Sequence, residues 1–197
     1  KTALSQAIGK MIKQGLEEDW SLRCLAMVDG EGANRVCTAM TVTATTPLLV
    51  RQAELKDETL LLEWANDVTT RRNSFSPESI TAATHRIWFR SRLRNLDGCR
   101  LYIVETTDGL PVGQARFERR EQDWEVHYAL APVFRGRGLG RVLLEMALQR
   151  LRADMRGVLI FGKVKYSNNS SRKVFESLGF ESQNSADEDA IVYQRVL

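Results

Sequence analysis

A glycine-rich turn between a predicted strand and a predicted helix constrains this chain more than any other feature. Residues 124–130 alternate apolar and polar side chains, as a strand with one buried face does. From Leu139 onward the apolar residues follow a helical period. The turn holds three glycines and three arginines: Arg135, Gly136, Arg137, Gly138, Gly140 and Arg141. Because glycine permits close approach and a helix start offers unpaired N–H groups, this segment predicts a phosphate-binding loop.

The spacing of the glycines excludes two common phosphate loops. A nucleotide P-loop needs Lys-Ser/Thr after its last glycine, but Gly140 is followed by Arg141 and Val142. The dinucleotide fingerprint fails because the three glycines are spaced two and two. The spacing Arg135-x-x-Gly138-x-Gly140 resembles the signature of the GNAT superfamily of acyl-CoA-dependent N-acyltransferases. A glycine-rich turn without a ligand is the alternative for this loop alone.

A second motif near the C-terminal end supports the same resemblance. Residues 158–164 form an apolar run typical of a buried parallel strand. A capped helix then begins near Asn168 and ends at Gly179, with Phe180 starting the next strand. An Asn followed seven residues later by an aromatic, here Phe175, and then by Leu-Gly-Phe resembles the second GNAT motif.

Composition narrows the classes of protein and partner. The 197 residues suit one domain with an appendage, and 43% apolar residues suffice for a core, while no apolar run reaches membrane-spanning length. A net charge of +3 is too small to predict nucleic-acid binding. Three cysteines and two histidines without ligand spacing predict reduced thiols and no metal. We expect a cytoplasmic protein with no membrane partner; the oligomeric state stays open.

The first 46 residues differ from the rest and are interpreted as a separate segment. Helical periodicity at the start leads to a string at Asp29–Val36 that resembles the C-terminal end of the GT-B-type UDP-sugar hydrolase of pseudaminic acid biosynthesis. Together with a first residue that is not Met, this predicts a fragment of a bifunctional fusion. We therefore divide the chain into 1–46, a GT-B-like remnant plus linker, and 47–197, a GNAT domain. An ordinary helical extension is the alternative.

The pattern of the remaining chain predicts a mixed α/β (α+β) fold, in which helices flank a central mixed sheet, in the element order of a GNAT domain. Strands are expected at 48–51, 101–105, 112–118, 124–130, 158–164 and 190–196, and helices at 57–64, from Ser76, after Gly138 and from Asn168. Ser76 is expected to cap the long second helix and Pro77 to open it. Arg71 and Arg72 are placed in a loop before that helix.

The resemblance implies where coenzyme A binds. The pantetheine arm would pair with the backbone of the central strand, and the pyrophosphate would lie on the amides of the glycine loop. The implied cofactor-binding set is Tyr128, Ala129, Leu130, Arg135, Gly136, Arg137, Gly138, Leu139, Gly140, Arg141, Asn168, Ser171 and Phe175.

Acetyl transfer to an amine also needs a base, an oxyanion donor and a proton for the thiolate. Glu125 is the first choice for the base, because its place before Pro132 matches a glutamate common in GNAT members; Glu118 is second and His127 third. A solvated sheet-edge side chain is the alternative for each. Since Phe175 stands where many members carry a proton-donating Tyr, the proton would come from Tyr166, a Ser, a water on Asn168, or no side chain.

The sequence therefore predicts an acetyl-CoA-dependent N-acetyltransferase for a small-molecule primary amine. The hydrolase-like string predicts a nucleotide-linked amino-dideoxy sugar as acceptor, with Arg71 and Arg72 on its diphosphate and His127 in the acceptor site. One alternative is acetylation of protein N-termini, because residues 125–128 also resemble ribosomal-protein acetyltransferases. A second is a CoA-binding module without catalysis.

Overall fold

The computed structural model describes residues 32–185 and 189–197. The chain divides into two units, which meet between Thr41 and Val42. Of the first unit, one helix is described, α3 (Gly32–Thr41), which holds the last five residues of the hydrolase-like string. The earlier residues of that string, and the helix predicted near the start of the chain, lie outside the described residues.

The second unit is built on a seven-stranded sheet in the order β1-β2-β3-β4-β5-β7-β6. Its strands are β1 (Leu48–Gln52), β2 (Cys99–Thr106), β3 (Pro111–Arg120), β4 (Asp123–Leu130), β5 (Leu159–Lys165), β6 (Glu181–Asn184) and β7 (Ala190–Val196). All neighbouring pairs are antiparallel except β4 and β5. This confirms the predicted mixed sheet flanked by helices.

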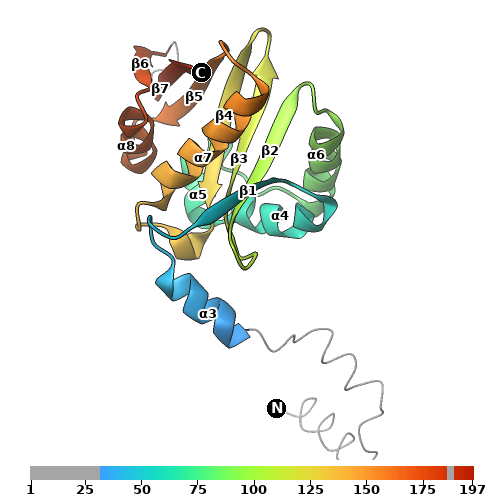
Figure 1. The fold of residues 1–197 in the computed structure, drawn as a ribbon. Coiled ribbons are helices and arrows are strands. Elements are labelled where there is room, and N and C mark those ends of the chain that lie inside the picture. Colours follow the sequence, from blue (N-terminus) through green and yellow to red (C-terminus); the bar gives the residue numbers. More distant parts are fainter. Residues whose placement is uncertain (1–31, 186–188) are drawn as a thin grey trace, which may run out of the picture. The chain divides into compact units, whose positions relative to one another are not determined.

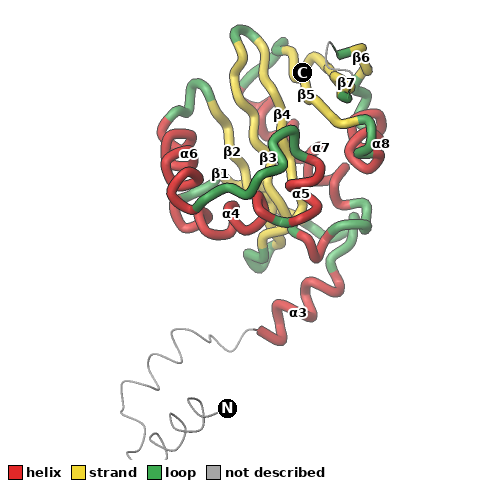
Figure 2. Tube along the Cα trace, turned by 180° about the vertical axis from the view of Figure 1, so that it is seen from behind, coloured by secondary structure: helices red, strands yellow, loops and turns green. Residues whose placement is uncertain are grey.

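Helices cover both faces of this sheet. They are α4 (Glu58–Asn66), α5 (Val68–Asn73), α6 (Ala82–Arg94), α7 (Leu139–Asp154) and α8 (Asn169–Ser177), with short 3-10 turns η1 (Leu55–Asp57) and η2 (Pro132–Phe134). Helices α6 and α7 lie on opposite faces of the strands (Figures 1 and 2). Part of the core lies under α7, where Leu139, Leu143 and Leu151 are fully buried.

Neighbouring strand positions fix which side chains share a face. Glu118 of β3 lies opposite Glu125 of β4, and Arg116 lies opposite His127. A side chain at Gly113 would strike Leu143 of α7, so the odd positions of β3 face α7. The even positions of β3 and the odd positions of β4 therefore face α6.

Strands β4 and β5 pair over only two positions. Trp124 lies opposite Ile160 and Glu125 opposite Phe161, and the register ends there. From Val126 to Leu130, β4 is paired with β3 alone among the described strands. The two strands therefore separate in the middle of the sheet, on the side where the chain turns into α7 (Figure 1).

The region before α6 differs from the prediction. Ser76 and Pro77 do not open the long helix; it begins at Ala82, and the Thr81 side chain accepts from the Thr84 amide as its N-cap. The predicted loop holding the two arginines is mostly a short helix, α5, capped by Asp67. Ser-Pro is a common helix start, but here Thr81 supplies the same hydroxyl cap five residues later.

Candidate active site

The glycine loop presents an uncapped helix start. Gly136 and Gly138 have φ of +77° and +76°, a left-handed conformation that favours glycine. Gly138 is the N-cap of α7 and provides no side-chain hydrogen bond to the first turn. The amides of the first turn are thus left to a ligand, and the 16-residue helix adds a partial positive charge. These residues fit a phosphate group.

The last glycine of the motif has a packing role. A Cβ on Gly140 would lie 3.4 Å from Val174 Cγ2 of α8 and 3.7 Å from Tyr128 Cε2 of β4. These are ordinary van der Waals distances, so an alanine would just fit here, whereas a longer side chain would meet Val174 and Tyr128. Gly140 therefore keeps the helix start close to β4 and α8, beside the separation of the two strands.

The three arginines of the motif have different surroundings. Arg135 turns back to Asp67 at 2.5 Å, Thr70 Oγ1 at 3.1 Å and the Leu130 carbonyl at 3.4 Å. It therefore links the cap of α5 to the end of β4. Arg137 donates to the Val42 carbonyl at 3.4 Å, and Arg141 is exposed on the first turn of α7.

Beyond Glu125, the edge of β4 offers backbone groups to a ligand. The Ala131 amide donates to the Val112 carbonyl, so the odd residues of β4 bond to β3. The N–H and C=O groups of Tyr128 and Leu130 then point toward β5, which has already separated. The Leu130 carbonyl takes the long bond from Arg135. An extended ligand with amide groups, such as a pantetheine arm, fits this edge.

The residues of the second motif form the start and the body of α8, beside the region where β4 and β5 separate. Asn168 caps α8 by accepting from the Ser171 amide at 3.2 Å, and the Ser171 hydroxyl lies 3.2 Å from the Tyr128 hydroxyl. Phe175 lies in the core, 2% exposed, stacked on Tyr193. Burial raises the pKa of Tyr128 to about 12, so its hydroxyl keeps its proton at neutral pH.

The face of β3 and β4 toward α6 carries a cluster of charged side chains. We call it the ionic cluster; its members are Arg92, Arg116, Glu118, Arg120, Glu125 and His127. Glu118, 5% exposed, accepts from Arg92 at 2.7 Å and Arg120 at 3.1 Å, and lies 3.3 Å from Arg116. Glu125 accepts from Arg120 at 2.9 Å and lies 3.5 Å from His127 Nε2.

The three candidate bases differ in protonation. Contact with His127, and then with Arg120, lowers the pKa of Glu125 to about 2. Burial alone would raise the pKa of Glu118, but the charges of Arg116 and Arg92 outweigh it and lower that pKa. Burial lowers the pKa of His127 below 6.5, with Glu125 opposing the shift. His127 is therefore mostly neutral at pH 7, whereas both carboxylates are ionised.

The structure separates the two arginines predicted to bind the acceptor. Arg71 donates to three backbone carbonyls, those of Ala65, Ser76 and Glu78, at 2.5–3.3 Å. It therefore holds the segment between α5 and α6 in place, which leaves little of its guanidinium for a ligand. The side chain of Arg72 is exposed, while its carbonyl accepts from Lys165 at 3.0 Å.

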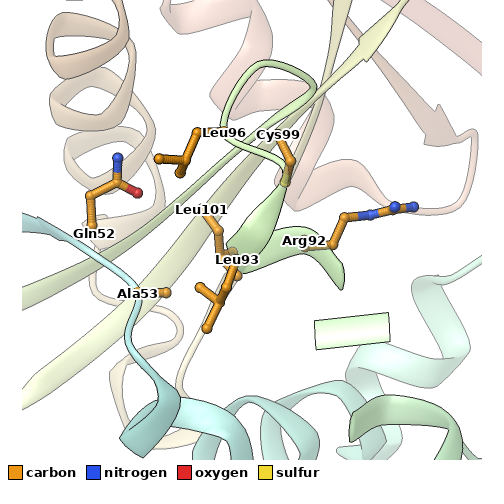
Figure 3. Close-up of a pocket in the computed structure, with 7 residues that line it drawn as sticks. All are labelled: Gln52, Ala53, Arg92, Leu93, Leu96, Cys99 and Leu101. Carbon is orange, nitrogen blue, oxygen red and sulfur yellow. The ribbon is translucent and has the colours of Figure 1, made fainter. Parts of the chain in front are cut away.

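A pocket lies beside the ionic cluster, between α6, the end of β1 and the start of β2. Its lining residues are Gln52, Ala53, Arg92, Leu93, Leu96, Cys99 and Leu101. Arg92 extends away from the other lining side chains (Figure 3), and its Nε bonds to Glu118. Burial raises the pKa of the Cys99 thiol to about 11, so it is no thiolate nucleophile at neutral pH.

Sequence reasoning did not find Arg92, Arg116 or the side chain of Tyr128 as site residues. Nothing in the helical spacing of Arg92 indicates that it bonds to Glu118. Arg116 could have been found by its place two residues before Glu118, on the same predicted strand face. Tyr128 was assigned a backbone role only, because the distance to Ser171 depends on the tertiary fold.

Within 32–185 and 189–197, no three His, Cys, Asp or Glu side chains are grouped so that they could hold a metal. In the same ranges, the helices are too short or too polar to cross a bilayer.

Several known proteins share this architecture. One is spermidine N-acetyltransferase from Vibrio cholerae, solved with CoA and spermine (TM-score 0.67, 17% identity, 76% of this chain and 95% of that chain). A ribosomal L7/L12 alpha-N-protein acetyltransferase solved with CoA has a TM-score of 0.65 at 16% identity, covering 79% of this chain and 97% of that chain. A phosphinothricin acetyltransferase from Sinorhizobium meliloti, solved with acetyl-CoA, has a TM-score of 0.63 at 20% identity, covering 76% and 88%.

The sequence itself decides the family. No curated protein sequence matches the chain significantly. The model of the acetyltransferase (GNAT) domain matches residues 47–181, which include the glycine loop, the separated strands and the capped helix α8. The chain therefore belongs to the GNAT acetyltransferase family.

Proposed function

We propose that this protein transfers an acetyl group from acetyl-CoA to a primary amine that binds on the α6 side of β3 and β4. The observation that carries this is the separation of β4 from β5 beyond Glu125. On one side of that point lies the uncapped start of α7, and on the other face of β4 lies the ionic cluster. The proposal thus puts the thioester and the amine on the two sides of one strand.

The cofactor side is assigned to backbone groups. The amides of Leu139, Gly140 and Arg141 would hold the pyrophosphate, with Arg141 as an exposed cation beside it. The backbone N–H and C=O of Tyr128 and the N–H of Leu130, which point toward β5, would pair with the pantetheine arm. When bound, acetyl-CoA would supply the activated acyl group, and the Tyr128 amide, which points toward β5, would be the donor available to stabilise developing negative charge.

His127 is proposed as the base that takes the proton from the acceptor ammonium. It is the one mostly neutral group among the three candidates, and it shares a strand face with Glu125. Glu125 is already ionised and close to Nε2, so it favours the tautomer with the proton on Nε2. Nδ1 is then the nitrogen that accepts a proton, and Glu125, ranked first from sequence, acts as a positioning residue.

The Tyr128 hydroxyl is proposed as the proton donor to the departing thiolate. Phe175 has no hydroxyl and is packed in the core, while Asn168 is used as the cap of α8. Tyr128 stays protonated because its pKa is raised to about 12, and its hydroxyl donates to Ser171 Oγ at 3.2 Å. The proton given to the thiolate would be replaced from solvent. This supplies the donor that the second motif lacks.

The acceptor is proposed to be the amine of a nucleotide-linked amino-dideoxy sugar. The hydrolase-like string at Asp29–Val36 motivates this, and exposed Arg72 remains as a cation for the diphosphate. The similar structures include enzymes whose names state a polyamine, a ribosomal protein and phosphinothricin as acceptors. A protein N-terminus is the second candidate, since a ribosomal-protein acetyltransferase shares the fold and the 125–128 segment resembles that class.

The test is to compare kcat/KM for a UDP-linked 4-amino-4,6-dideoxy sugar with that for a short peptide carrying a free N-terminus. We expect the sugar to be preferred by at least about tenfold, which corresponds to about 1.4 kcal/mol. A tenfold preference for the peptide would contradict the sugar proposal. Acetyl-CoA binding without turnover of any amine would instead indicate a CoA-binding module.

A further inference from the structure

Two neighbouring side chains on the α6 face of β3 have buried polar atoms that the described residues leave without a hydrogen bond. They are Gln114 Oε1 and Arg116 Nε, and Arg116 Nε has only the 3.3 Å ion-pair contact with Glu118. Buried polar atoms are almost always paired. Two such atoms on side chains two residues apart, on one face of β3, indicate that a polar molecule belongs on this face.

The charges of the ionic cluster indicate the sign of that molecule. Its three arginines, Arg92, Arg116 and Arg120, are matched by two carboxylates, Glu118 and Glu125. His127 adds no charge at neutral pH, because burial lowers its pKa. The cluster therefore carries one positive charge in excess.

The excess is concentrated at Arg116. Its contact with Glu118 is 3.3 Å, whereas Arg92 holds the same carboxylate oxygen at 2.7 Å. The Arg116 guanidinium lies 4.9 Å above the Trp88 ring, and 19% of its side chain is exposed. Burial lowers the pKa of Arg116, and since arginine nevertheless stays protonated, it is the cation that gains most from an added anion.

We propose that the acceptor carries an anionic group besides its amine, and that Arg116 binds this anion while Gln114 and His127 hold the amine. The inference rests on the proposed acetyl transfer on this face. Cβ atoms of opposed residues are about 5 Å apart, so amine and anion can be separated by one carbon or by about the width of a sugar ring. Amino acids and nucleotide-linked amino sugars meet this condition.

A polyamine does not meet this condition, because it carries no anionic group besides its amines. Spermidine would bring further positive charge to a face that already has one in excess, and both carboxylates are occupied by arginines. Like charges in a partly buried site repel by several kcal/mol at worst, and by about 1 kcal/mol when well hydrated. This face therefore disfavours amines that lack an anionic group, and it disfavours those with additional positive charge most strongly.

The test uses matched acceptors on the full chain. Leucine is compared with leucinamide, and the UDP-linked amino sugar with the methyl glycoside of the same sugar, with spermidine as the cationic extreme. Equilibrium binding to CoA-saturated protein is measured beside kcat/KM, so the preference is known even if no amine is acetylated. We expect the anionic member of at least one pair to be preferred about tenfold or more, and spermidine to be the poorest.

Variants of Arg116 test whether this residue causes the preference for acceptors with an anionic group. Arg116→Gln should reduce the preference to less than about threefold with unchanged acetyl-CoA affinity, and Arg116→Lys should keep part of it. Arg90→Gln is the matched control, because Arg90 lies on α6 but bonds to Glu58. Preference for the neutral or cationic member, or an unchanged preference in folded Arg116→Gln, overturns the inference. Turnover of acetyl-CoA is scored separately, since its absence contradicts the proposed function alone.

Discussion

Replacing His127 with Gln tests the assignment of the base. A carboxylate with a pKa of about 2, as in Glu125, is a poor acceptor for the proton of an ammonium group. His127 is neutral at pH 7, because burial lowers its pKa, and it can accept that proton. A positioned base contributes about 10²–10⁴-fold to the rate. We expect His127→Gln to lower kcat/KM by that factor.

The pH dependence follows from the direction of the shift. The pKa of His127 is lowered below 6.5, so at least about three quarters of the His127 side chains are neutral at pH 7. The decrease of kcat/KM in His127→Gln should therefore be nearly fully expressed at this pH. Burial is the largest cause of this lower pKa; Arg116 lowers it further, while Glu125 and Glu118 oppose the shift. In the native protein kcat/KM should rise through a pKa below 6.5 as pH increases. His127→Gln should lack this step.

The assay compares His127→Gln with Glu125→Gln between pH 5 and 9, with acetyl-CoA affinity measured by calorimetry. Glu125→Gln should lose no more than about tenfold, because the amide oxygen can still accept the Nε2 proton. The reasoning is refuted if Glu125→Gln loses 100-fold or more while His127→Gln keeps the native rate and pH profile. In that case Glu125 is the base, as ranked from sequence.

Three further predictions concern the rest of the site. Gly138→Asp should abolish acetyl-CoA binding in calorimetry, because a carboxylate meets the phosphate; Gly138→Asn, which tolerates the φ of +76° without charge, should bind more weakly than native but measurably. Tyr128→Phe should lower kcat about tenfold at unchanged acetyl-CoA affinity, and an unchanged kcat would remove the hydroxyl from the mechanism. Arg135→Ala should cost about 1–3 kcal/mol in urea unfolding, because Asp67 loses its charged partner. The control Arg150→Ala, whose ion pair is exposed, should cost less than about 1 kcal/mol, and equal losses would contradict the linking role of Arg135.

Local sequence signals were sufficient where they act within one element. The alternation over β4, the left-handed glycines and the helical period of α7 each arise within a few residues, and the structure confirms the elements that they predict. The helix before β2 was misplaced because Ser76 and Thr81 are equally good caps by type. Which one is used depends on Asn66, whose side chain bonds both the N–H and the carbonyl of Ile80 just before α6.

The ionic cluster could not be read in the same way. Glu118 and Glu125 were chosen as candidate bases on predicted strands. The ionisation of Glu118 depends on Arg92, which comes from a helix 26 residues before it.

Phe175 was expected beside the cofactor. Its ring end would lie 2.6 Å from a Cβ on Gly162, so the ring packs in the space that this glycine leaves open on β5. Such matches between distant residues are visible only in three dimensions.

The short pairing of β4 with β5 divides the sheet into two hydrogen-bonded ladders. Strands β1–β4 form one and β5, β7 and β6 form the other, joined by two register positions and by α7 packed on α8. A joint of this kind lets the smaller ladder open as its own cooperative unit, at less free energy than global unfolding. A molecule bonded to both β4 and the start of α7 raises that opening free energy by mass action. The concentration of acetyl-CoA would thereby set the hydrogen-exchange rate of the β5 amides and the rate at which a protease cleaves the chain.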